Sequence, residues 1–126
     1  MAVKSQLVDI GGRSLHVLEA GAGEPVVLFE AGLNDWSRAW LCVQAEVART
    51  TRTISYDRAG RGQSHWVPPL RSAGDAAADL ARLLDELAGD APVVIVHRAL
   101  DGLEKLFTRG EAKPLRLLRR LGYEAF

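Results

Sequence analysis

The order of apolar and polar positions predicts short strands in the first part of the chain. Residues 5–21 hold two partly alternating runs around Gly11-Gly12, a pattern typical of a β-hairpin closed by a tight turn. The continuous apolar run Val26 to Phe29 has the length of a strand buried on both faces, and residues 91–97 form a similar run. Residues 51–57 predict one further strand between these two.

Two helices are predicted between the strands. Residues 35–50 place Trp36, Trp40, Val43 and Val47 at helical spacing, so one stripe should face a core. Residues 72–89 give the strongest helical pattern, with leucines on one face. Ser72 is a suitable N-cap with Asp75 three residues later, and Gly89 follows the last leucine. The order β-β-β-α-β-α-β predicts an α/β fold in which an antiparallel hairpin joins a parallel sheet.

The remaining residues predict two C-terminal helices. Leu100, Leu103, Leu106 and Phe107 have the spacing of a short amphipathic helix. A second helix should run from Pro114 to Leu121 and end at Gly122, because proline suits a first helical position and glycine a helix end. We expect one domain over residues 1–126.

Composition excludes several kinds of protein. The 126 residues include 16 basic and 16 acidic side chains, so no overall charge favours nucleic acid or an anionic membrane. One cysteine, Cys42, allows no internal disulfide; it falls in an apolar helical pattern that predicts a buried thiol. No cluster of histidine and cysteine suggests a metal, and no glycine motif suggests a nucleotide cofactor. We therefore expect no cofactor, metal, nucleic acid or membrane partner, and a cytoplasmic location.

Four stretches together resemble the α/β-hydrolase family, over about residues 5–97. They are the opening hairpin with the strand after it, the loop sequence EAGLNDWSRAW from Glu30, the sequence DRAGRGQS from Asp57, and the helix from Ser72. The resemblance implies a hydrolase of ester or amide type. It also implies that the loop after the strand ending at Phe29 supplies an oxyanion-binding N–H group, from Gly32 or Leu33. Residues 98–126 form a divergent tail.

The resemblance further implies a structural turn close to the site. The matching residues are Asp57, Arg58, Gly60, Gly62 and Ser64. The aspartate can accept hydrogen bonds from backbone N–H groups of its own loop, and the glycines permit left-handed backbone. Arg58 and Arg61 could instead bind an anionic substrate.

The catalytic serine of that family has no counterpart here. It should follow the strand ending at Val96, but His97, Arg98 and Ala99 stand there, and an always-protonated guanidinium cannot act as an acyl nucleophile. Asp101 lies too far beyond His97 to replace it. His97 and His65 remain weak catalytic candidates, and His16 is expected to be a satisfied or surface position on a strand.

These observations leave three hypotheses. The first is a truncated or frame-altered hydrolase that is inactive alone; net charge also changes sign at His97, with 9 basic and 12 acidic residues before it and 7 and 4 from it onward. The second is a small hydrolase with an atypical site completed by oligomerisation. The third is a non-catalytic interaction module that uses the helix from Pro114. A homodimer could form through an exposed sheet edge or through that helix.

Overall fold

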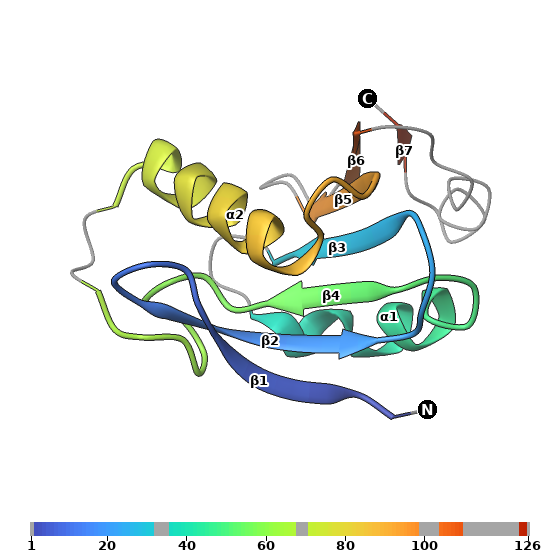
Figure 1. Cartoon of the computed structure of the whole chain (residues 1–126), viewed down its shortest axis with the longest axis horizontal. Coiled ribbons are helices and arrows are strands. Elements are labelled where there is room, and N and C mark those ends of the chain that lie inside the picture. Colours follow the sequence, from blue (N-terminus) through green and yellow to red (C-terminus); the bar gives the residue numbers. More distant parts are fainter. Residues whose placement is uncertain (1, 32–35, 68–70, 99–103, 110–123, 126) are drawn as a thin grey trace.

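A seven-stranded mixed sheet forms the centre of the molecule, with a helix on each face (Figure 1). The computed structural model describes residues 2–31, 36–67, 71–98, 104–109 and 124–125. The sheet order is β1-β2-β4-β3-β5-β6-β7. The strands are β1 (Lys4–Asp9), β2 (Ser14–Ala20), β3 (Val26–Glu30), β4 (Thr53–Tyr56), β5 (Val93–Arg98), β6 (Glu104–Arg109) and β7 (Glu124–Ala125).

The predicted hairpin and parallel strands are confirmed. β1 pairs antiparallel with β2, and Gly11 and Gly12, with φ of 92° and 86°, close the turn between them. A pair of residues with positive φ matches the twist of a hairpin, and glycine adopts it without strain. β3 pairs in parallel with both β4 and β5, so the three strands end at one edge.

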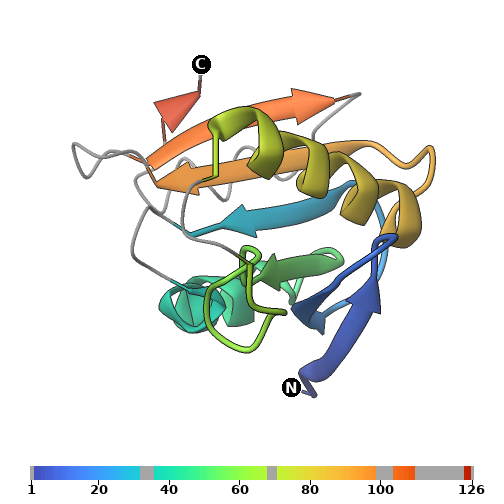
Figure 2. The same cartoon turned by 90° about the vertical axis from the view of Figure 1, so that its left-hand side faces the viewer.

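The helices cover opposite faces of the sheet, as the second view shows (Figure 2). A short 3-10 helix, η1 (Ser37–Trp40), leads into α1 (Leu41–Val47), while α2 (Ala73–Leu87) lies on the other face. Val26 and Leu28 pack on the α2 side, whereas Val27 and Phe29 pack on the α1 side with Trp40. Burial on both faces explains why β3 is apolar from Val26 to Phe29.

Local signals set the helix ends as expected. Ser72 Oγ accepts the N–H of Asp75, and the Asp75 carboxylate accepts the N–H of Ser72, which completes the capping box. Gly89 follows the end of α2 with φ of 54°. Two expectations on the first helix are wrong: Trp36 is 40% exposed, and Cys42 is exposed rather than buried. Gln44 occupies the buried position instead.

The first predicted C-terminal helix is wrong, because residues 104–109 form strand β6. This strand pairs antiparallel with β5, with Leu106 opposite Val96 and Phe107 opposite Ile95. Without it, the N–H and C=O groups along one side of β5 would have no ladder partner, and pairing outweighs a local helical spacing. β5 is therefore an inner strand of the sheet, between β3 and β6. The second predicted helix, from Pro114 to Leu121, lies outside the described residues.

Neither helix in the described part of the chain has the length and apolar content needed to cross a bilayer.

Candidate functional site

The ends of the three parallel strands bring Glu30, Tyr56 and His97 side by side. In the sheet register Glu30 lies opposite Tyr56 on one side and opposite His97 on the other. Ligands bind in folds of this type beyond the carboxyl ends of the strands, where the loops begin. This edge is therefore the place to look for the chemistry predicted from sequence.

The Glu30 carboxylate connects the side chains at this edge. Its Oε1 accepts hydrogen bonds from Arg58 Nη2 at 2.8 Å, Arg58 Nε at 3.1 Å and Tyr56 Oη at 3.1 Å. Its Oε2 lies 3.4 Å from His97 Nδ1, which makes no hydrogen bond within the described residues. Arg58 is thus held by a carboxylate instead of being a free anion-binding group. Glu30 lies in the oxyanion-loop motif, but no spacing or neighbour in the sequence marks it as a site residue.

Tyr56 cannot serve as a nucleophile at neutral pH. Burial raises the pKa of the Tyr56 hydroxyl well above its usual value, and the negative charge of Glu30 raises it further. The phenol therefore stays protonated and acts as a hydrogen-bond donor to Glu30. His97 has an imidazole at this edge, but no hydroxyl or thiol of the described residues is hydrogen-bonded to it.

Asp57 follows β4, and its buried carboxylate accepts hydrogen bonds from three donors. Its Oδ1 accepts the N–H of Ser37 at 2.7 Å, and its Oδ2 accepts the N–H of Gln63 and His16 Nδ1, both at 3.0 Å. Burial alone would raise the pKa of this carboxyl group, but the hydrogen bonds from Gln63 and Ser37 outweigh it and lower the pKa. Asp57 thus joins its own loop, the start of η1 and strand β2.

The turn after Asp57 is closed by hydrogen bonds and contains two glycines with left-handed backbone. Gly60 and Gly62 have φ of 80° and 49°, and Ser64 Oγ donates to the Asp57 carbonyl. A Cβ on Gly62 would lie 2.3 Å from Asp57 Oδ2, so only glycine fits at this position. The geometry is that of a structural turn, since its polar atoms bond to one another and to β2.

His16 contacts Asp57 from the sheet and is not a surface residue. It is 5% exposed, and its Nε2 lies 2.8 Å from Ser5 Oγ on the neighbouring strand β1. The two residues of the His16–Asp57 pair are 41 positions apart, so no local spacing in the sequence could indicate it. Nothing in the sequence distinguishes Ser5 either, because it is one of several polar residues on an alternating strand.

The other predicted site residues do not assemble around His97. His65 Nδ1 accepts the N–H of Ser14 at 3.0 Å, which places it beside the start of β2. Arg98 is the last residue of β5. Gly32, Leu33 and Asp101 lie outside the described residues, so the oxyanion-loop expectation stays a prediction.

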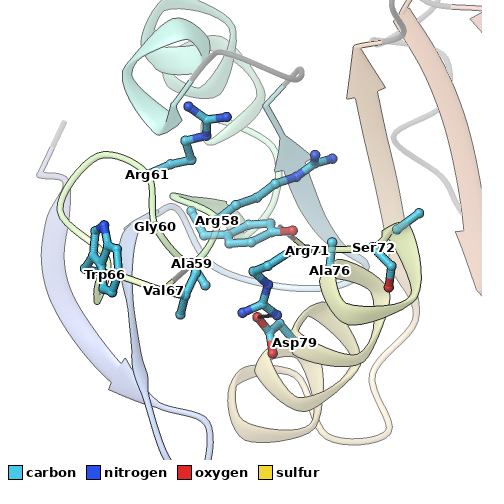
Figure 3. Close-up of a pocket in the computed structure, with 12 residues that line it drawn as sticks. Arg58, Ala59, Gly60, Arg61, Trp66, Val67, Arg71, Ser72, Ala76 and Asp79 are labelled. Atoms are coloured by element: carbon cyan, nitrogen blue, oxygen red, sulfur yellow. Dashed lines mark hydrogen bonds and ion pairs between the residues drawn. The ribbon is translucent and has the colours of Figure 1, made fainter. Parts of the chain in front are cut away.

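A cavity of about 390 Å³ lies beside this edge, on the α2 face (Figure 3). Trp66 and Val67 border one side, and Ser72, Ala76 and Asp79 border the other. The Arg71 side chain points to Asp79, and their closest approach is 2.8 Å. Tyr56 and Arg58 are shared with the edge, but neither Glu30 nor His97 lines the cavity. The cavity therefore offers space next to the strand ends without a nucleophile–base pair.

The described residues contain no group of three or more histidine, cysteine, aspartate or glutamate side chains placed to hold a metal ion.

Comparison with known proteins gives partial matches. No protein-family model matches the chain. The probable transporter efuK of Hormonema carpetanum is 33% identical over 108 residues, covering 80% of this chain and 15% of that protein. An epoxide hydrolase of Caballeronia sordidicola is 32% identical over 146 aligned positions, covering 95% of this chain and 43% of the relative.

Solved structures match the same architecture. The epoxide hydrolase VrEH1 from Vigna radiata has a TM-score of 0.70 and 26% identity, over 76% of this chain and 32% of that protein. The chain thus spans less than half the length of each of these three proteins.

Proposed function

The chain belongs to the α/β-hydrolase family through its N-terminal part, and we propose that it is an altered member without the family's Ser-Asp-His triad. As a single chain it does not hydrolyse substrate through the family site. The class of reaction from which it derives is hydrolysis of esters, amides or related bonds. Hydrolases among the relatives support this class.

The path of the chain after β5 carries the proposal. In this architecture the nucleophile stands on a sharp turn between a strand and a helix. Here β5 ends at Arg98 and is followed by an antiparallel strand, with Glu104 opposite Arg98. Only residues 99–103 connect the two strands, and the sequence there has no serine, threonine or cysteine. A reversal into a neighbouring strand takes the position at which the helix should begin.

The two carboxylates at the edge already accept hydrogen bonds from other groups. Glu30 holds Arg58 and Tyr56, and Asp57 holds two backbone N–H groups and His16, so neither carboxylate orients an imidazole toward a serine at the end of β5. An ion-paired cluster of this kind stabilises the ends of parallel strands. We therefore assign it a structural role in this chain.

Turnover measurements with the purified chain test the proposal. We expect ester, amide and epoxide substrates to be consumed at rates that are equal in the wild type, His97→Ala and His65→Ala. A second possibility is a small hydrolase completed by another subunit, and it predicts a loss of turnover in one of these variants. That loss, with unchanged circular dichroism, would contradict the proposal.

We also propose that copies of the chain associate through a sheet edge, because β1 and β7 end the seven-stranded order. Sedimentation at increasing concentration tests this.

The cytoplasmic location is likewise a proposal; its support is that one cysteine cannot form an internal disulfide. Cell fractionation checks it.

A further inference from the structure

We propose that Ser5, His16 and Asp57 form a second, separate nucleophilic site, in which the Ser5 hydroxyl accepts an acyl or phosphonyl group from small activated esters and fluorides. The proposal does not depend on the function proposed above. Its residues lie on β1, on β2 and after β4, and none lies at the end of β5.

The distances are those of a relay from hydroxyl to imidazole to carboxylate. Ser5 Oγ lies 2.8 Å from His16 Nε2, and His16 Nδ1 lies 3.0 Å from Asp57 Oδ2. The hairpin register explains the first contact. Leu7 is opposite His16, so Ser5, two residues before Leu7, is the diagonal neighbour on the same face. The chain order serine, histidine, aspartate also differs from the family order serine, acid, histidine.

The surroundings of Asp57 fix the proton on the imidazole. Two backbone N–H groups already occupy Asp57, and its lowered pKa keeps it ionised at neutral pH. An ionised carboxylate can only accept, so Nδ1 of His16 must carry the hydrogen. In the neutral ring Nε2 is then an acceptor, and the Ser5 hydroxyl is the donor that faces it. This is the arrangement in which histidine can act as general base for a serine.

The Ser5 hydroxyl is exposed to solvent, whereas the His16 ring and the Asp57 carboxylate are buried. Asp57 is 0% and His16 5% exposed, whereas Ser5 lies exposed on the edge strand β1. A reagent can therefore reach the hydroxyl, while the groups that polarise it are shielded from water. Ser5 does not line the cavity described above, so that cavity does not select substrates for it. The site should accept small, unhindered and strongly activated electrophiles.

The reaction balances without a co-reactant. Ser5 Oγ bonds to the phosphorus of a fluorophosphonate or to the carbonyl carbon of an aryl ester. The P–F or C–O(aryl) bond breaks, and the Ser5 proton passes to His16 Nε2. Fluoride or the aryloxide leaves, and the imidazolium then returns its proton to the leaving group or to water.

Stoichiometric labelling of the intact chain tests the proposal. The protein is treated with an alkyl fluorophosphonate and, separately, with p-nitrophenyl acetate, and adducts are located by peptide mass spectrometry. Ser72 serves as an internal control, because it is also exposed but bonds to a backbone N–H instead of an imidazole. We expect Ser5 to react at least about 10²-fold faster than Ser72, the scale of general-base assistance. Equal rates at the two serines would overturn the proposal.

Variants separate this site from the family site. Ser5→Ala, at an exposed position, should keep the fold and lose the adduct, and His97→Ala should label like the wild type. His16→Gln should lower labelling of Ser5 to the rate of Ser72. If His16→Gln does not fold, the labelling rates of Ser5 and Ser72 in the wild type still test the proposal. Labelling that persists at Ser5 in a folded His16→Gln variant would contradict the proposal, whereas turnover lost in His97→Ala would contradict only the function proposed earlier.

Discussion

At the scale of single residues, the buried carboxylate of Asp57 connects three segments of the chain. It satisfies one N–H from η1, one from its own turn and the ring of His16, so three segments depend on one side chain. Gly62 leaves the space that the carboxylate occupies. Buried charge is tolerated at this position because every contact stabilises the ionised form.

Acid should therefore destabilise the protein through Asp57. Its pKa in the folded state is lower than the value of about 3.9 expected in an unfolded chain. Its stabilisation is then fully present above about pH 5 and is lost as pH falls through the unfolded-state pKa to the lower folded-state pKa. Urea unfolding at pH 7, 5, 4 and 3 should show the free energy of unfolding falling only below about pH 5.

The exposed carboxylate of Asp75 also makes the free energy of unfolding fall in acid. The capping-box hydrogen bonds with Ser72 lower the pKa of Asp75. An Asp75→Asn variant should keep most of the acid sensitivity if Asp57 dominates. A free energy of unfolding that stays constant from pH 5 to pH 3 in this variant would contradict the role assigned to Asp57.

At the scale of elements, a buried polar contact attaches α1 to the sheet. Gln44 Nε2 donates to the Leu18 carbonyl at 2.9 Å, and its Oε1 accepts from Ser55 Oγ at 2.8 Å. Gln44 is 1% exposed and Ser55 0%. A stripe of tryptophan and valine does not predict such a contact, because its partners come from β2 and β4.

Replacing Gln44 by leucine should destabilise the fold by about 1–3 kcal/mol, since both partners would lose their hydrogen bonds in a dry interior. Urea denaturation measures the change. Ser55→Ala should cost less in the Gln44→Leu background than in the wild type, because the hydroxyl there has already lost its acceptor. A Gln44→Leu protein as stable as the wild type would show that the contact is dispensable.

At the scale of the whole molecule, β6 completes the sheet next to β5. The helices cover the faces, but only strand pairing covers an edge. The register from Val93 opposite Arg109 to Arg98 opposite Glu104 runs the full length of β5. The tail after Arg98 thus has a structural role that is independent of any catalytic function.

Two shortened chains test that role. A chain ending at Arg109 keeps β6, whereas a chain ending at Arg98 leaves β5 unpaired on one side. We expect the shorter chain to form larger species, because an open apolar strand recruits another strand. Size-exclusion chromatography and sedimentation compare them at equal concentration. Equal behaviour of the two chains would show that β6 does not protect β5.

The sequence by itself determined the hairpin, the buried strands, the capped helix α2 and the lack of a serine at the end of β5. Each of these depends on neighbours within a few residues: Gly11-Gly12 in a turn, Ser72 with Asp75, four apolar residues from Val26. Short-range patterns determine such features because backbone torsions and burial periodicity are local properties.

Only the tertiary structure decided the strand β6 and the side-chain contacts between distant elements. Leu106 and Phe107 fit a helix by spacing, yet they lie in a strand, because β5 offers unpaired backbone groups that no local pattern reveals. The contacts of Ser5 with His16 and of His16 with Asp57 join residues from different elements. Such contacts depend on sheet register and chain reversal, which exist only after the elements have packed together.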